Sequence, residues 1–498
     1  MISNVIPDIK GLLATGGKID ENFVYFMAYL YSIATGEIGA VDLFKTAKDS
    51  KYGKYSAAFK DTYRLGIGWS YGLATACEMM GKIVSNRKDD PMKLLLVKLS
   101  QVVRLGDDLK AFFRDELKNS ILTYSIKYEA NLETQKLFSE MFYTLMSTAA
   151  FMISANSIMS MLMGFGDSGQ ILIISMMGTG SGMAVFVAMM YFMFPRDKLA
   201  HINPVIEKQF RMKMYLAIGA SAGISAVLII TGIVPPVLAV GLGGIPLLYP
   251  GILAKKAESK ITSYTEWYPT FILHFCQLFA TVGSMGQALQ AVMRSNFGTI
   301  QIFIDSFKNR IKNRIDQIIG FELFSIETEN HLIASGNSII SAGIYKGADM
   351  NIVGNVVSDL TKKINELRGK RIQNASTFQL VVIILHVLSL SVFGLMNKLT
   401  DLFNGISGGD LSNVAFELTP IDPGLMSAMM PVLVIMTSVI SGFAIKIVKG
   451  GLYKTVFFYI GLLLVIGGVS MYVISSFMSE FLEQIIFTAP LPGIIPGV

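Results

Sequence analysis

Two short motifs in the sequence carry residue types that could do chemistry. The first, Gly164-Phe165-Gly166-Asp167, matches the Gly-x-Gly-Asp signature of intramembrane aspartyl proteases. Such a protease needs two carboxylates that share a water, one acting as acid and the other as base. No second Asp lies in any apolar segment of the chain, and Asp167 itself falls in a turn between two such segments. The motif therefore predicts no protease activity.

The second motif lies in residues 11–19, which nearly spell a phosphate-binding loop. This segment has an extra Gly before Lys18 and lacks the Ser or Thr that would hold magnesium. Cys77 and Cys276, together with the four histidines, show no spacing typical of a zinc site and are too few for a disulfide framework. The sequence thus predicts no catalytic residue, no cofactor and no metal. Any ATPase that acts with this chain must be another polypeptide.

The composition excludes a soluble globular enzyme. Of the 498 residues, 52% are hydrophobic and only 16% are charged, whereas soluble domains carry about 25% charged residues. A spanning helix needs about 20 apolar residues to cross roughly 30 Å of hydrocarbon. One long run without Asp, Glu, Lys or Arg is cut into two spans by a turn at 232–236. The sequence predicts an all-α polytopic membrane protein with about seven transmembrane helices, in the charge-free runs 141–166, 168–195, 214–254, 372–397, 423–445 and 455–479.

The distribution of Lys and Arg predicts which side of the membrane each polar segment occupies, because these residues resist translocation. With the N-terminus in the cytoplasm, 41 of the 42 basic residues fall on the cytoplasmic side, with 29 of the 36 acidic residues. Residues 1–20 have only short apolar patches, broken by Asp8, Lys10 and Lys18, and no continuous apolar stretch of the length that a signal peptide needs. We therefore expect a multi-pass protein of the cell membrane with a cytoplasmic N-terminus.

Tyrosines aside, His386 is the only residue within a predicted span that could titrate. A lone histidine in a span is more often a helix–helix hydrogen-bond partner than a proton carrier. Ion-coupled transporters usually place charged groups at a coupling site inside the membrane. This pattern weighs against a transporter or channel with regulatory cytosolic domains, which stays open as an alternative.

Two polar segments, 1–140 and 255–371, share an order of motifs that predicts two cytosolic helical-bundle repeats. In each, an apolar helix leads into a Gly-x-x-Gly turn, then a short motif ending in Gly, and later a second Gly-centred turn. The matching pairs are 24–35 with 271–282, 36–39 with 283–286, 50–53 with 295–298, and 103–109 with 340–343. The rest of the chain divides into four transmembrane helices at 141–254 with a basic cytosolic loop at 195–213, three at 372–479 with an external loop at 398–422, and an external tail at 480–498.

This order of motifs and spans resembles the inner-membrane platform family of type II secretion and type IV pilus machines. The run Arg-Leu-Gly-Asp-Asp-Leu-Lys-Ala-Phe-Phe at 104–113 makes the chain most similar to the archaeal branch, which serves the archaellum, or archaeal flagellum. The resemblance covers nearly the whole chain. The second repeat departs from the first, with Gly-Ile-Tyr-Lys at 343–346 where the first has Gly-Asp-Asp-Leu at 106–109. We therefore do not expect equal roles for the two copies.

The resemblance implies a non-enzymatic platform on which a cytosolic hexameric secretion ATPase docks. ATP turnover would rearrange the platform, which would lift pilin-like (archaellin) subunits from the bilayer into a growing filament beside other motor components. The resemblance also implies a homodimer. An adhesion pilus or a type II secretion-like system would use the same parts, so both stay open as alternatives, as does a passive membrane scaffold.

Two groups of basic residues are candidates for the ATPase-docking surface. Clustered positive charge speeds association with an acidic protein face through long-range attraction. The alternatives are a solvated helix face or binding to anionic membrane lipid, and we expect no nucleic acid partner because acidic residues balance the basic ones locally. The first group lies in the first repeat and contains Lys93, Lys98, Arg104, Lys110 and Arg114, together with the turn residue Gly106 around which they cluster. The second group lies in the second repeat and contains Lys308, Arg310, Lys312 and Arg314.

Two Gly-x-x-x-Gly pairs in the spans are candidates for helix packing, because glycine lets helix backbones approach closely. We expect both pairs to face other helices. They are Gly178 with Gly182 in the second span and Gly219 with Gly223 in the third.

Overall fold

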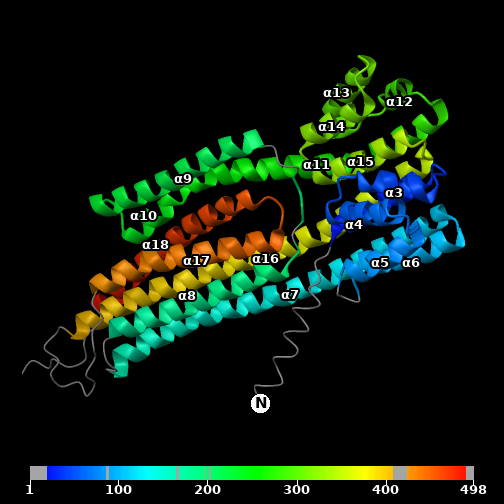
Figure 1. Ribbon diagram of the computed structural model, residues 1–498. Helices are drawn as coiled ribbons and strands as arrows, with labels where there is room; N and C mark the ends of the chain where they lie inside the picture. Colours follow the sequence, from blue (N-terminus) through cyan, green and yellow to red (C-terminus); the bar gives the residue numbers. More distant parts are fainter. Residues whose placement is uncertain are drawn as a thin grey trace, which may run out of the picture. The chain divides into compact units, whose positions relative to one another are not determined.

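The structure, a computed structural model, describes residues 20–85, 89–163, 168–195, 197–200, 204–407 and 423–488 (Figure 1). These residues form α-helices with short π- and 3₁₀-helical turns, and their only β-type pairing is an isolated bridge between Ala200 and Asn330. The expected all-α fold is confirmed. The segment 11–19, the motif at 164–167 and most of the expected external loop and tail lie outside the described residues.

The chain forms two compact units. Unit 1 contains Met1–Asn131, Asp197–Asn203 and Glu258–Lys370, and unit 2 contains Leu132–Arg196, Pro204–Ala257 and Arg371–Val498. The two polar segments in which the sequence predicts repeats contribute mainly to unit 1. Three long helices have residues in both units, namely α7 (Leu109–Met163), α11 (Ile245–Val282) and α16 (Met350–Ser407).

Unit 1 is built around α2 (Glu21–Ala34), in which every residue from Phe23 onward is buried. Asp20 begins this helix by accepting a hydrogen bond from the backbone N–H of Asn22, as a typical N-cap does. α2 packs against α15, so the N-terminal and central polar segments share one core. The other helices of unit 1 are α3 (Ala40–Lys48), α4 (Lys54–Tyr63), η1 (Arg64–Gly68), α5 (Leu73–Ile83), α6 (Pro91–Leu105), α12 (Met285–Val292), η2 (Gly298–Ile300), α13 (Gln301–Lys312), α14 (Gln317–Thr328) and α15 (His331–Tyr345).

Unit 2 contains the apolar helices, of which α8 and α18 both pack against α17. Its own elements are α8 (Ser168–Met193), α9 (Pro204–Thr231), α10 (Pro236–Gly243), α17 (Pro423–Lys449), η3 (Tyr453–Thr455) and α18 (Val456–Thr488). Six helices of the described residues are long and apolar enough to cross a membrane, at Gly169–Met193, Phe210–Thr231, Pro236–Val282, Met350–Asp401, Gly424–Lys449 and Tyr453–Phe481. A polytopic membrane protein is thus confirmed.

The first expected span, 141–166, is not among these six helices. Its residues up to Met163 form the end of α7, and its last residues lie outside the described part of the chain. The count of seven spans therefore stays a prediction.

Close helix packing in unit 2 uses other glycines than the expected pairs. A Cβ atom at any of the four expected positions would meet no atom within 4 Å, so none of them faces a neighbouring helix in the described chain. α10 and α18 instead cross at Gly241 and Gly468, where a Cβ on Gly468 would lie 2.6 Å from Gly241 Cα. A Gly-x-x-x-Gly pair marks a face suited to packing, and contact of these two faces with other helices stays a prediction. The four outward positions are Gly178, Gly182, Gly219 and Gly223.

Substitution of Gly468 by alanine should destabilise unit 2, whereas the same change at Gly223 should not. The new methyl group at Gly468 would press on the backbone of α10, and overpacking of this kind typically costs about 1–3 kcal/mol. At Gly223 the methyl group meets open space, and alanine favours the helix. Thermal unfolding of the two variants in detergent measures the difference. Equal melting temperatures would contradict the crossing at Gly241 and Gly468.

Arg371 satisfies the ends of two helices in unit 2. Its guanidinium is buried and donates hydrogen bonds to the carbonyl oxygens of Ile447 and Val448, near the end of α17, at 3.0 Å each. It also donates to the carbonyl oxygen of Pro195, just after α8, at 2.7 Å. The last carbonyl groups of a helix have no hydrogen-bond partner within the helix, and such a group is costly to bury without one. Arg371 supplies that partner near the ends of α17 and α8.

His386 of α16 is a helix–helix hydrogen-bond partner, as expected. Its Nε2 lies 3.2 Å from the carbonyl oxygen of Leu463 in α18 and 3.2 Å from Ser438 Oγ in α17. The imidazole is fully buried and joins three helices of unit 2.

Candidate docking surface

Arg104 and Gly106 of the first candidate group lie at one end of the hairpin formed by α5 and α6, Lys98 lies in the middle of α6, and Lys93 lies near the other end. These consecutive helices pack together through Gly81 and Val97, and the short connection between them makes them antiparallel. The segment before α5 and the turn after α6 therefore lie at the same end. Gly106 makes that turn with a φ of +74°, a left-handed conformation that glycine adopts at helix C-termini.

The basic residues of the first group lie on α6 and the start of α7, and acidic residues pair with several of them. Lys93 donates to the backbone oxygen of Ser85, and the backbone N–H of Lys110 donates to Asp108 at 2.8 Å. Three other members of the group form ion pairs that partly neutralise their positive charge, which weakens long-range attraction. The ion pairs are Lys98–Glu116 at 2.6 Å, Arg104–Glu78 at 3.0 Å and Arg114–Asp115 at 3.1 Å.

The second group does not form one basic face. Arg310 of α13 binds Glu327 of α14 through both guanidinium nitrogens, one of them at 3.0 Å. Lys308 pairs with Asp305 at 3.3 Å, and Arg314 lies beyond the end of the helix with a φ of +59°. The basic residues of this group occupy every second position, and side chains two positions apart on a helix point to nearly opposite sides. They therefore cannot form a single basic surface. Of this group, Lys312 and Arg314 are exposed and have no ion pair in the described residues.

Two aromatic residues that the sequence analysis did not single out are exposed just before α5, at the end of the hairpin where Gly106 lies. Trp69 is 62% exposed and Tyr71 is 53% exposed, in the segment between η1 and α5. Ser70 between them has a φ of +59°, a strained conformation for a residue other than glycine. Exposed tryptophan and tyrosine are typical anchors of protein interfaces. The signal in the sequence was the segment Gly-Ile-Gly-Trp-Ser-Tyr-Gly at 66–72, whose glycines mark a turn instead of an apolar helix face.

The described residues contain no cluster of groups that could act as a metal site. No three or more His, Cys, Asp or Glu side chains in that part of the chain come together to hold a metal ion. Cys77 and Cys276 are both fully buried, and burial raises the pKa of the Cys77 thiol to about 12. This thiol is therefore protonated at neutral pH and a poor nucleophile.

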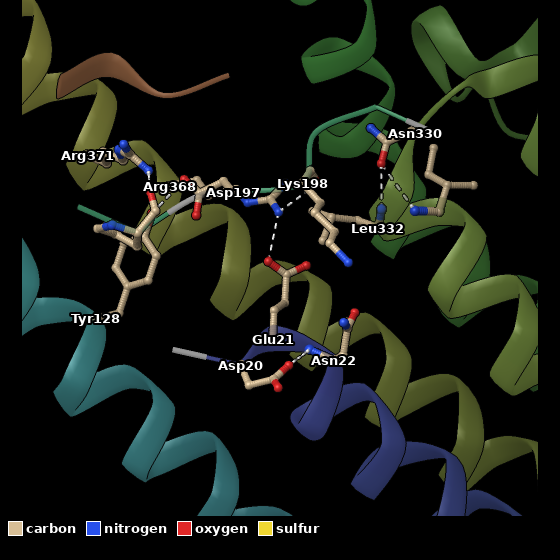
Figure 2. Close-up of polar contacts among 12 residues, drawn as sticks. Asp20, Glu21, Asn22, Tyr128, Asp197, Lys198, Asn330, Leu332, Arg368 and Arg371 are labelled. Carbon is tan, nitrogen blue, oxygen red and sulfur yellow. Dashed lines mark hydrogen bonds and ion pairs between the residues drawn. The ribbon is translucent and has the colours of Figure 1, made fainter. Parts of the chain in front are cut away.

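A buried ion pair joins α2 to α16 inside unit 1, as Figure 2 shows. Arg368 Nη2 lies 2.9 Å from Glu21 Oε2 and 3.2 Å from the backbone oxygen of Lys198. Burial raises the pKa of Glu21, and the charge of Arg368 counters part of that rise. Burial by itself would lower the pKa of Arg368, but the carboxylates of Glu21 and Asp197 raise it. Removal of two charges from water costs free energy, so the pair adds little net stability. Its contacts join α2, α16 and the segment 197–200 in one arrangement.

Further hydrogen bonds hold the short segment 197–200 to unit 1. Asp197 accepts a hydrogen bond from the hydroxyl of Tyr128 in α7 at 3.0 Å, and Leu199 accepts one from the backbone N–H of His331 at 3.2 Å. Asn330 pairs with Ala200 and caps α15. This segment lies between α8 and α9 in the chain, and its hydrogen bonds make it part of unit 1.

The fold defines an all-α polytopic membrane protein whose polar segments build a large helical unit. The chain is 23% identical over 456 residues to flagella accessory protein J of Methanocaldococcus jannaschii, which covers 87% of this chain and 80% of that protein. It is 21% identical over 466 residues to flagella accessory protein J of Methanococcus voltae, with 88% and 81% covered. No protein-family model and no solved structure matches. These homologues confirm the resemblance to an archaellum platform protein.

Proposed function

We propose that this chain is the membrane platform of an archaeal type IV pilus-like machine, the archaellum. The observation that carries this proposal is similarity along 87% of the chain to an archaeal flagella accessory protein. The presence of apolar helices and of a large helical unit in one chain supports it, because a platform must both sit in the bilayer and offer a protein surface. The chain itself performs no catalysis in this proposal.

In this function a cytosolic hexameric secretion ATPase docks on unit 1 at the end of the α5–α6 hairpin. Trp69 and Tyr71 supply apolar contact area, and the basic residues near Gly106 supply attraction to an acidic face. The segment 197–200 offers a route to the membrane helices, because it joins unit 1 by hydrogen bonds and α8 and α9 by the backbone. ATP turnover would thereby promote insertion of pilin-like subunits and assembly or rotation of the filament. We expect the platform to act as a homodimer.

Binding to the ATPase tests this function directly. The full chain in detergent should co-purify with the secretion ATPase of its own organism and should stimulate the ATP turnover of that enzyme. A substrate-dependent flux through proteoliposomes, with no effect on ATPase, would favour a transporter or channel. Binding without any effect on turnover or on filament assembly would favour a passive scaffold.

The orientation in this proposal places both polar segments of unit 1 in the cytoplasm. Single cysteines introduced at Lys60 in α4 and at Lys312 in α13 should both be protected from a membrane-impermeant maleimide in intact cells and labelled after lysis. The native Cys77 and Cys276 are buried and should give little background. Labelling of the two introduced cysteines from opposite sides of the membrane would overturn the topology.

A further inference from the structure

Unit 2 contains a cavity of about 250 Å³ at one end of its apolar helices. It lies where α10 begins, α16 leaves its apolar stretch, α17 begins and the second half of α18 passes. Pockets that enclose a drug-sized ligand have about 300–1,000 Å³. The cavity therefore suits a small chemical group rather than a whole metabolite.

The polar side chains that line this cavity are rich in hydrogen-bond donors. Asn397 and Lys398 come from α16, and Ser476 comes from α18. Lys398 is the only Lys or Arg between Arg371 and Lys446, and its side chain is 29% exposed. In the part of the chain that the structure describes, the Asn397 amide and the Ser476 hydroxyl make no hydrogen bond. An ammonium, an amide and a hydroxyl together favour an anion with several acceptor oxygens.

The rest of the lining is apolar. Met430 of α17, Met471 of α18 and Val237 of α10 contribute side chains to the cavity. These residues belong to helices that are long and apolar enough to span a membrane. A ligand in this position would thus meet donors on one part of its surface and hydrocarbon on another, as an amphiphile does.

We propose that this cavity binds the phosphate head group of an anionic membrane lipid. The Lys398 ammonium and the neighbouring donors contact the phosphate oxygens, and the methionine side chains contact the first carbons of the lipid chains. This role is independent of ATPase docking, which uses unit 1.

Asp401 is the group that competes with the lipid for Lys398. Its carboxylate lies 3.2 Å from Lys398 Nζ, one turn further along α16, and it is nearly half exposed. An exposed ion pair of this kind is weak, so a phosphate with several oxygens can displace the carboxylate. Removal of the Asp401 charge should therefore strengthen lipid binding, whereas removal of the Lys398 charge should weaken it.

Binding of phosphatidylglycerol to the purified full chain tests the proposal. Native mass spectrometry in neutral detergent counts bound phosphatidylglycerol, with phosphatidylcholine and inorganic phosphate as comparison probes. Lys398→Gln should weaken phosphatidylglycerol binding roughly tenfold through loss of a charge-assisted hydrogen bond, and Asp401→Asn should strengthen it. Lys256→Gln, which removes an exposed charge from α11, is the matched control and should leave binding unchanged.

Each outcome of these binding measurements either supports the lipid as the ligand of the cavity or replaces it with another explanation. Selective phosphatidylglycerol binding that depends on Lys398 and not on Lys256 supports the proposal. Inorganic phosphate that binds as tightly as the lipid would assign the cavity to a soluble anion and overturn the lipid assignment. Lipid binding unchanged in Lys398→Gln would also overturn it, because Lys398 would then only extend toward water. The same unchanged binding with loss of filament assembly would assign the cavity to a protein partner.

Discussion

Replacement of Arg368 by alanine should destabilise unit 1 by about 3–5 kcal/mol, because removal of one partner leaves a buried charge without compensation. The Glu21 side chain is almost wholly enclosed, and one of its oxygens already lacks a hydrogen-bond partner. The variant also loses the hydrogen bond to Lys198, so the segment 197–200 should loosen. Hydrogen exchange of the full chain in detergent should show faster exchange in α2 and in that segment.

The double variant Glu21→Leu with Arg368→Met separates the charge from the packing. Apolar residues of similar size often replace a buried ion pair without loss of stability, so the double variant should recover most of the stability lost in Arg368→Ala. Lys370→Ala is the control on the same helix, since Lys370 makes only exposed pairs with Glu129 and Glu366. If Arg368→Ala and Lys370→Ala changed stability equally, the ion pair would have no structural role.

Trp69→Ala should weaken ATPase binding about 30-fold, the effect of losing an interface anchor worth about 2 kcal/mol. The indole is mostly exposed in the free chain, so its removal costs little folding stability. Tyr345→Ala is the matched control, because Tyr345 is an exposed aromatic residue of unit 1 in a different helix. Titration of the ATPase against the full chain in detergent measures both affinities.

Reversal of charge at Arg104, Lys110 and Arg114 should act on the same surface in a different way. Substitution of all three by glutamate should slow association and weaken binding, with the larger effect at low salt, while membrane insertion stays intact. Lys60→Glu, on the exposed side of α4, is the charge control. Unchanged affinity at low salt in the triple variant, together with unchanged affinity in Trp69→Ala, would remove the α5–α6 hairpin from the docking surface.

The position of Trp69 shows why the proposed docking surface could be only half predicted from the sequence. Basic residues near Gly106 were visible in the sequence as a cluster, but their carboxylate partners were not. Glu78 lies 26 residues before Arg104 in the chain, and only the packing of α5 on α6 brings the two together at 3.0 Å. The glycines at 66–72 mark a turn around Trp69 in the sequence, but only the structure shows that its side chain is left exposed.

The glycines of unit 2 show the same limit inside the membrane. Gly178 and Gly223 lie in the pattern that favours close packing, yet the close crossing falls at Gly241 and Gly468, which are 227 positions apart. Helix pairing in a bilayer depends on shape at the contact, and all faces of an apolar helix look alike in composition. The choice of face is therefore a property of the assembled bundle.

The amino-acid sequence by itself determined that this protein is all-α, crosses a membrane several times and resembles the archaellum platform. The first two conclusions need only local properties, since an apolar run long enough to span the bilayer can be recognised within about 20 residues, and the resemblance needs only the order of motifs along the chain. The tertiary structure decided that Glu21 meets Arg368, which polar segments share a core and where aromatic side chains stay exposed. Such facts depend on contacts between residues hundreds of positions apart, and no local pattern in the chain specifies them.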